Sequence, residues 1–176
     1  IRALLARALQ VDVQRLVFAA PRSGKPLLRF PDRGAQFNSS HSGEWILHAI
    51  TRFEPVGVDV EAVRQDFAQV EDFEAVLAPE ELHTLRAVVP GGRAKLLAAI
   101  WARKEAYVKA LGNGFAYPTT SFAVSPKPGS NDALLFDDEA SGGSANWRVT
   151  EIVAPSGFCA ALAAAGRGSS VVQRSA

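Results

Sequence analysis

The chain has 176 residues, of which 48% are hydrophobic and 21% are charged, and its formal net charge is +1. These values are typical of a globular protein, and the length is sufficient to bury one core or two small ones. No apolar run is long enough to cross a bilayer, and the single cysteine, Cys159, excludes a disulfide within the chain. We therefore expect a cytoplasmic protein that is neither exported nor membrane-bound.

Charge is distributed unevenly along the chain. Residues 1–35 contain seven Lys or Arg residues against two acidic ones, a net charge of +5. Such a segment suits phosphates or an acidic partner protein, although scattered surface arginines would give the same count. Because the sequence starts at Ile1 and contains no methionine, we expect its N-terminal part to be incomplete.

Up to residue 55 the pattern predicts a short amphipathic helix followed by strands. The helix spans Arg2–Gln10, and the strands span 15–20, 35–39 and 45–51. Pro21–Pro26 has the glycine and prolines of a turn, and the polar residues 40–44 are expected to form the turn between the last two strands.

After residue 55 the pattern predicts a strand, then helices, then further strands. These elements are the strand 56–61, the helices 66–77, 79–88 and 94–111, and the strands 121–125, 133–136, 147–153 and 158–164. A helix followed by strands thus occurs twice, so we expect an α+β fold of two similar halves, residues 1–55 and 56–165. Residues 166–176 have little to bury, and we expect them to form a disordered tail.

Two acidic residues alternate with valines in the predicted strand 56–61. Asp59 and Glu61 are two residues apart and therefore point to the same side of the strand, while Val58 and Val60 point to the other side. Such alternation is most often the solvated face of a half-buried sheet. This segment alone therefore does not define a site.

The predicted helix 94–111 carries a second charged pair. Trp101, Glu105 and Lys109 are spaced four residues apart and share one face. A Glu–Lys pair is common on helix surfaces, but a tryptophan beside it indicates that this face contacts other parts of the protein. Three carboxylates gathered in one place need a cation among them, and oxygen ligands favour Mg²⁺, which also binds substrate phosphates. Zinc is not expected, because the three histidines lack ligand spacing.

A polar cluster, Asn38–Ser42, lies near the end of a predicted strand. Its Asn, Ser and His side chains offer hydrogen bonds suited to a phosphate, and Lys25, between a glycine and a proline, adds a positive charge at a rigid turn. A hydrophilic turn explains the same cluster. A Ser–His nucleophile pair that includes His41 is disfavoured, because the sequence contains no G-x-S-x-G motif.

Four motifs follow one another along the chain. They are Gly24–Pro26, Asn38–Ser42, Gly57–Glu61, and a longer series made of Trp101, Lys104, Glu105, Ala106, Lys109 and Gly112. In order and approximate spacing they resemble the motifs of the surfactin-type (Sfp-type) 4′-phosphopantetheinyl transferases, in the form with Trp and Lys-Glu-Ala. The resemblance covers residues 1 to about 125 and continues more loosely through the closing strands.

The resemblance implies a fold and an activity. The fold consists of two α/β halves related by a pseudo-two-fold axis, with coenzyme A bound at the active site in the cleft between them. The activity is Mg²⁺-dependent transfer of 4′-phosphopantetheine from coenzyme A to a serine of an acyl or peptidyl carrier protein, with release of adenosine 3′,5′-bisphosphate. A monomer that binds no nucleic acid is expected.

The resemblance also assigns roles to residues. Asp59, Glu61 and Glu105 match the Mg²⁺ ligands, and Glu81 falls where the family often has a further acidic residue near the metal. The residues expected to contact coenzyme A are Ser23, Gly24, Lys25, Pro26, Ser40, His41 and Lys109. The expected catalytic residues are Glu105, Lys109 and His41, with Glu105 as the candidate base for the serine proton.

Two other classes of protein remain open. A Mg²⁺-dependent nuclease or phosphoesterase would use the same carboxylates and lysines, although the basic residues are not concentrated enough for a phosphate track. A non-catalytic module would bind coenzyme A or a carrier protein without turnover. Mg²⁺-dependent cleavage of DNA or RNA would identify the first, and Mg²⁺-independent binding of coenzyme A the second.

Overall fold

The structure is a computed structural model that describes residues 1–20, 25–64, 70–112, 117–130, 133–137, 147–166 and 172–173. The first part of the chain contains α1 (Arg2–Leu9), β1 (Val17–Ala19), β2 (Leu27–Phe30), β3 (Ala35–Ser42) and β4 (Trp45–Arg52). The second part contains β5 (Val56–Ala62), α2 (Pro79–Ala87), α3 (Pro90–Leu111), β6 (Phe122–Val124), β7 (Leu134–Asp137), β8 (Trp147–Ile152) and β9 (Phe158–Ala165). The predicted α+β class is confirmed, whereas the pseudo-two-fold relation between halves and the boundary at residue 55 stay predictions.

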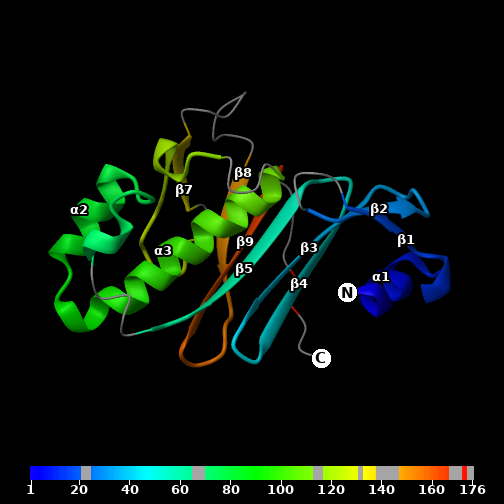
Figure 1. Ribbon diagram of the computed structural model, residues 1–176, viewed down its shortest axis with the longest axis horizontal. Coiled ribbons are helices and arrows are strands. Elements are labelled where there is room, and N and C mark those ends of the chain that lie inside the picture. Colours follow the sequence, from blue (N-terminus) through cyan, green and yellow to red (C-terminus); the bar gives the residue numbers. More distant parts are fainter. Residues whose placement is uncertain are drawn as a thin grey trace.

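The long helix α3 packs on an antiparallel sheet in which β9 pairs with both β5 and β8 (Figure 1). The sequence permits a close approach because β9 is rich in alanine and β5 has Gly57 under the helix. A Cβ atom built on Gly57 would lie 2.0 Å from the Ala106 carbonyl oxygen of α3. The helix and the strand therefore touch backbone to backbone at this point, and the position requires glycine.

The β3–β4 hairpin lies beside β5, as Figure 1 shows. Hydrogen bonds made by side chains of β3 join β3 to β5. The backbone N–H of Val58 donates to Oδ1 of Asn38 at 2.9 Å, and the N–H of Ala62 donates to Oγ of Ser42 at 3.0 Å. Ser40 lies between them on the same face of β3 and donates to Asp59 of β5. We call these three side chains the seam between β3 and β5.

The first part of the chain has a small core of its own. Leu5 and Leu9 of α1 pack with Leu16 and Phe37, and the Phe18 and Phe37 rings meet edge to face with centroids 5.6 Å apart. This core packs against the start of β3, at Ala35 and Phe37. It therefore holds the strand that supplies the polar cluster of the sequence analysis.

One turn prediction is wrong in part, and one strand was not predicted. Residues 40–42, expected in a turn, continue β3, because Ser42 pairs with Trp45 across a two-residue loop. Gly43 opens that loop at φ 56°, a conformation that glycine adopts without strain and that suits a short hairpin. The strand β2 was not predicted, because its four residues follow a glycine- and proline-rich stretch.

The prediction of a helix at 66–77 is also wrong in the part of this range that the structure describes. Residues 65–69 lie outside the described ranges, and Val70–Phe73 forms a single 3-10 turn. Ala78 is extended (φ −68°, ψ 155°), as the residue before a proline must be, so the chain cannot run helically into α2.

Parts of the expected tail, 167–171 and 174–176, lie outside the described residues too. None of the described helices has the length and apolar character needed to span a membrane.

Candidate active site

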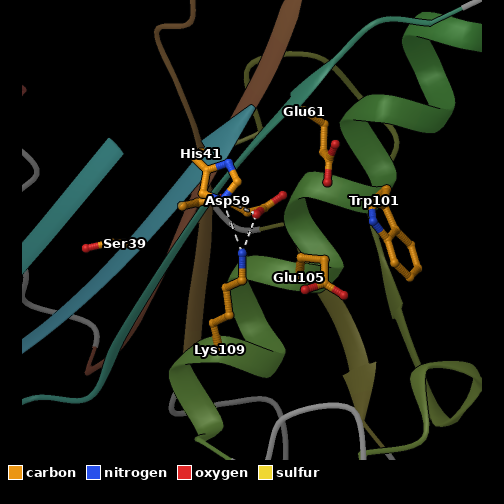
Figure 2. A pocket seen from close by; sticks show the side chains of 8 residues that line it. Ser39, His41, Asp59, Glu61, Trp101, Glu105 and Lys109 are labelled. Atoms are coloured by element: carbon orange, nitrogen blue, oxygen red, sulfur yellow. Dashed lines mark hydrogen bonds and ion pairs between the residues drawn. The ribbon is translucent and has the colours of Figure 1, made fainter. Parts of the chain in front are cut away.

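A pocket of about 340 Å³ opens where β3, β5 and α3 meet. Its lining residues are Ser39, Ser40 and His41 of β3, Asp59 and Glu61 of β5, and Trp101, Glu105 and Lys109 of α3. Figure 2 shows Lys109 reaching from the helix toward Asp59, with the His41 ring beside them. The period of two along β5 and the period of four along α3 thus bring the predicted residues into one pocket.

Asp59 is buried and its two carboxylate oxygens differ in their surroundings. Oδ1 accepts hydrogen bonds from Ser40 Oγ at 2.6 Å and from Lys109 Nζ at 2.5 Å. Oδ2 is also buried and has no hydrogen-bond partner among the described residues. Burial raises the pKa of Asp59 above its usual value, and the Lys109 charge and both hydrogen bonds oppose that rise.

Glu61 and Glu105 add two further carboxylates to the pocket. Burial raises the pKa of Glu61 to about 7, with repulsion from Asp59 as the next cause. Burial also raises the pKa of Glu105, and the positive charge of Lys109 opposes this effect. Both shifts have the same physical origin: a carboxylate in a dry, already negative pocket loses more hydration than it gains from partners.

Among the described residues, Lys109 is the one lysine that lines the pocket. Its Nζ donates to Asp59 and lies 3.3 Å from Ser40 Oγ. Three carboxylates against one ammonium leave an excess of negative charge. Combined with the unpartnered Oδ2 of Asp59, this excess is the pattern expected of a site that takes a cation.

The donor set fits a hard divalent cation such as Mg²⁺, which prefers carboxylate oxygens and retains waters or phosphate oxygens as its other ligands. The carboxylates are not, however, closed into a cage. Among the described residues, no three His, Cys, Asp or Glu side chains are already arranged to hold a metal ion. The pocket therefore offers ligands from two elements, β5 and α3, and leaves room for a ligand of the cation.

Comparison with known protein families shows the family of this chain. The model of the 4′-phosphopantetheinyl transferase superfamily matches residues 55–163, which include Asp59, Glu61, Glu105 and Lys109. The chain belongs to this superfamily. The resemblance seen in the four sequence motifs is thereby confirmed.

Relatives within the superfamily include the 4′-phosphopantetheinyl transferase Sfp of Bacillus subtilis. A 4′-phosphopantetheinyl transferase of Bacillus subtilis is 30% identical over 139 residues, which cover 78% of this chain and 60% of the relative. The transferase HetI of a Nostoc species is 30% identical over 171 residues, or 96% of this chain and 68% of that protein. The transferase gsp of Aneurinibacillus migulanus is 32% identical over 125 residues, or 70% and 50%. The chain thus spans about half to two thirds of the length of these transferases.

The first of the four motifs, Gly24–Pro26, is only partly described. Ser23 and Gly24 lie outside the described residues. Pro26 lines a second pocket of about 260 Å³ between β2 and the start of β3, together with Leu28, Arg29 and Gln36 among others. Lys25 lines neither pocket; its Nζ bonds backbone carbonyl oxygens of β5 and α3.

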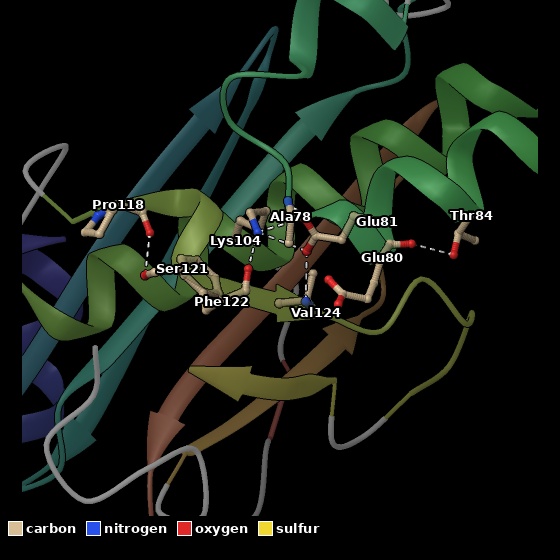
Figure 3. A network of polar contacts seen from close by, with 9 residues as sticks. All are labelled: Ala78, Glu80, Glu81, Thr84, Lys104, Pro118, Ser121, Phe122 and Val124. Carbon is tan, nitrogen blue, oxygen red and sulfur yellow. Dashed lines mark hydrogen bonds and ion pairs between the residues drawn. The ribbon is translucent and has the colours of Figure 1, made fainter. Parts of the chain in front are cut away.

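The position expected for Glu81 is wrong. Its carboxylate does not line the pocket but lies in the interior between α2, α3 and β6, where Figure 3 shows it beside Lys104. Lys104 Nζ donates to both carboxylate oxygens at 3.0 and 2.8 Å and to the Phe122 carbonyl at 2.8 Å. Glu81 also accepts from the N–H groups of Ala78 and Val124, each at 2.8 Å. Through these bonds Glu81 joins α2, α3 and β6, so its role is structural.

Sequence reasoning missed the roles of Asn38 and Lys104. Asn38 was grouped with phosphate ligands, yet its side chain bonds the backbone of β5. Lys104 belongs to the longest motif, but its partner lies 23 residues away on another helix. No signal in the local sequence indicated this role, because Arg103 and Glu105 on either side of Lys104 are charged and buried as well.

Proposed function

We propose that this chain transfers 4′-phosphopantetheine from coenzyme A to a serine of an acyl or peptidyl carrier protein and releases adenosine 3′,5′-bisphosphate. One observation carries the proposal: Asp59, Glu61, Glu105 and Lys109 line one pocket within the segment that matches the superfamily. That set suits a divalent cation and a diphosphate together. The names of the relatives, which are phosphopantetheinyl transferases, support the reaction.

Asp59, Glu61 and Glu105 are the residues that would hold Mg²⁺. Ser40 and Lys109 both engage Oδ1 of Asp59, which leaves Oδ2 as the oxygen available to a cation. When bound, Mg²⁺ would neutralise negative charge that builds on the bridging oxygen of the diphosphate.

Lys109 and His41 are the residues proposed to contact the diphosphate. Lys109 is held by Asp59 yet remains partly exposed to the pocket, so its ammonium can donate to a phosphate oxygen without moving far. His41 projects from β3 into the same pocket. Ser40 already donates its hydroxyl proton to Asp59, so its side chain orients that carboxylate beside the proposed phosphate contacts.

Glu105 is proposed as the base. The serine oxygen of the carrier forms a bond with the β-phosphorus of coenzyme A, the bond from that phosphorus to the bridging oxygen breaks, and the serine proton passes to Glu105. Burial raises the pKa of Glu105 and so makes its carboxylate a stronger base than an exposed glutamate. Lys109 stabilises the charge that develops on the leaving diphosphate oxygen.

The nucleotide of coenzyme A is proposed to follow β3 away from the carboxylates. The second pocket begins at the other end of β3, where Ala35, Gln36 and Phe37 meet Pro26. Arg29 lines this pocket and supplies a positive charge suited to a phosphate. As predicted from the sequence, we also propose a monomer located in the cytoplasm.

Intact-mass measurement of an apo carrier protein incubated with the chain, coenzyme A and Mg²⁺ tests the function. We expect a mass gain of one phosphopantetheine arm that disappears with a chelator. Binding of coenzyme A without any gain across several carriers would favour the non-catalytic module. Mg²⁺-dependent cleavage of DNA or RNA would favour the nuclease.

A further inference from the structure

The C-terminal end of α3 is closed by a lysine from a distant part of the chain. The last four carbonyl groups of a helix lack partners within the helix and need donors from elsewhere. Gly112 donates its N–H to the Val108 carbonyl at 3.2 Å. Lys25 Nζ donates to the next two carbonyls, Lys109 at 2.8 Å and Ala110 at 3.5 Å.

The same ammonium also holds the start of β5. Lys25 Nζ donates to the Val56 carbonyl oxygen at 2.8 Å, so one side chain bridges strand and helix. Val56 precedes Gly57, the point at which β5 and α3 touch backbone to backbone. Lys25 therefore closes the junction of the two elements that carry Asp59, Glu61, Glu105 and Lys109.

The electrostatics of this contact are those of a helix cap. Lys25 is partly buried, and burial lowers the pKa of its ammonium. Within the described part of the chain its ammonium contacts carbonyl oxygens and forms no ion pair with an acid. The negative end of the α3 dipole is thus its compensating charge, which stabilises both the helix terminus and the ammonium.

The position of this cap matters for the pocket. Lys109 supplies a carbonyl to Lys25 and, with its side chain, an ammonium to Asp59. If the last turn of α3 loosened, Lys109 Nζ would lose its fixed approach to Asp59. We propose that Lys25 is a positioning residue that fixes Lys109 and Asp59 by capping α3 against β5, and that this is its role in place of contacting coenzyme A.

This inference rests on the proposed function only for its kinetic part, and the experiment separates the two. Lys25→Met keeps the length of the side chain and removes its donors, and Lys25→Gln keeps N–H donors without charge. Lys95→Met, an exposed lysine on α3, is the matched control. Hydrogen exchange without ligand is measured on peptides that cover 105–112 and, as an internal reference, 90–98.

We expect Lys25→Met to accelerate exchange in 105–112 and not in 90–98, with Lys25→Gln intermediate and Lys95→Met unchanged. In the transfer assay we expect kcat to fall about tenfold or more while KM for coenzyme A stays nearly constant, because misplacement of a catalytic group lowers the rate of the chemical step. Combining Lys25→Met with Lys109→Met should add little to the loss from Lys109→Met alone.

A raised KM for coenzyme A with unchanged kcat and unchanged exchange would overturn the inference and make Lys25 a coenzyme ligand. If the unsubstituted chain transfers no phosphopantetheine, the proposed function fails, while the exchange data still decide whether Lys25 caps α3. If Lys25→Met does not fold, Lys25→Gln carries the same comparison.

Discussion

Helix α3 carries two charged clusters, one around Lys104 and one around the adjacent residue Glu105, and they differ in how completely their polar atoms are hydrogen-bonded. Lys104 meets Glu81 in the interior, where the ammonium and both carboxylate oxygens are fully hydrogen-bonded (Figure 3). Glu105 faces the pocket with Asp59, Glu61 and a single lysine, and one oxygen of Asp59 has no partner among the described residues. Both clusters use the same residue types on the same helix.

The difference separates structural charges from functional ones. A buried ion pair whose hydrogen bonds are complete has nothing left to offer a ligand, and it ties elements together. A cluster with an excess of one sign and an unused oxygen is stable only while a partner from outside is available or its groups stay protonated. Completeness of hydrogen bonding, more than residue identity, therefore distinguishes the two roles here.

The largest expected effect is on stability, and it follows from breaking the interior cluster. Lys104→Met leaves the Glu81 carboxylate buried without its cation, and we expect the free energy of unfolding to fall by about 3–5 kcal/mol. Urea denaturation measures it. Lys95→Met, on the exposed side of α3, should change stability by less than about 0.5 kcal/mol. Equal effects of the two variants would show that Lys104 is not structural.

The next effect belongs to the pocket and concerns rate instead of stability. Glu105→Gln should slow transfer about 100-fold or more, without lowering the free energy of unfolding, because burial already disfavours the charged carboxylate. Transfer is followed by carrier mass and stability by urea. Glu80→Gln, an exposed acid on α2, is the control. A Glu105→Gln variant that is active but unstable would reverse the roles assigned to the clusters.

The seam between β3 and β5 provides a smaller test. Asn38→Ala leaves the Val58 N–H without its acceptor beside the pocket, and we expect a loss of about 1–3 kcal/mol in unfolding free energy. Gln36→Ala, two residues earlier on β3, should have little effect. Unchanged urea midpoints for both variants would mean that the seam does not join the strands in solution.

The smallest effect compares neighbouring serines. Ser40 donates to Asp59, whereas Ser39 bonds His48 at 2.8 Å on the exposed face of the hairpin. Ser40→Ala should slow transfer about tenfold, the value of one hydrogen bond to a charged group, and Ser39→Ala should leave the rate nearly unchanged. Equal rates for the two variants would remove Ser40 from the positioning of Asp59.

The sequence was sufficient for the parts of the site that follow local periodicity. Alternation along 56–61 predicted that Asp59 and Glu61 share a side, and the four-residue spacing predicted that Trp101, Glu105 and Lys109 share a face. Both depend only on the geometry of a single strand or helix. The strands after residue 120 were found for the same reason.

The wrong predictions concern residues whose structure or role depends on contacts with other elements. The polar residues of β3 look like a turn because the sequence does not show that Asn38, Ser40 and Ser42 have β5 as their partner. Glu81 looks like a site residue until Lys104 is known to lie against it. The carbonyl groups that Lys25 contacts, more than 80 residues away in sequence, were also not predictable, while its expected contact with coenzyme A stays a prediction. No pattern within one element encodes such partners.

The contact at Gly57 predicts how this protein tolerates mutation. A Cβ atom there would meet the backbone of α3 at both Ala106 and Ala110, so no compensating side-chain change nearby can make room. Gly91, in the first turn of the same helix, has open space around it and could accept alanine with a gain in helix propensity. In a library of single substitutions, Gly57 should therefore be intolerant of every replacement although it has no side chain to contribute to chemistry, while Gly91 varies freely.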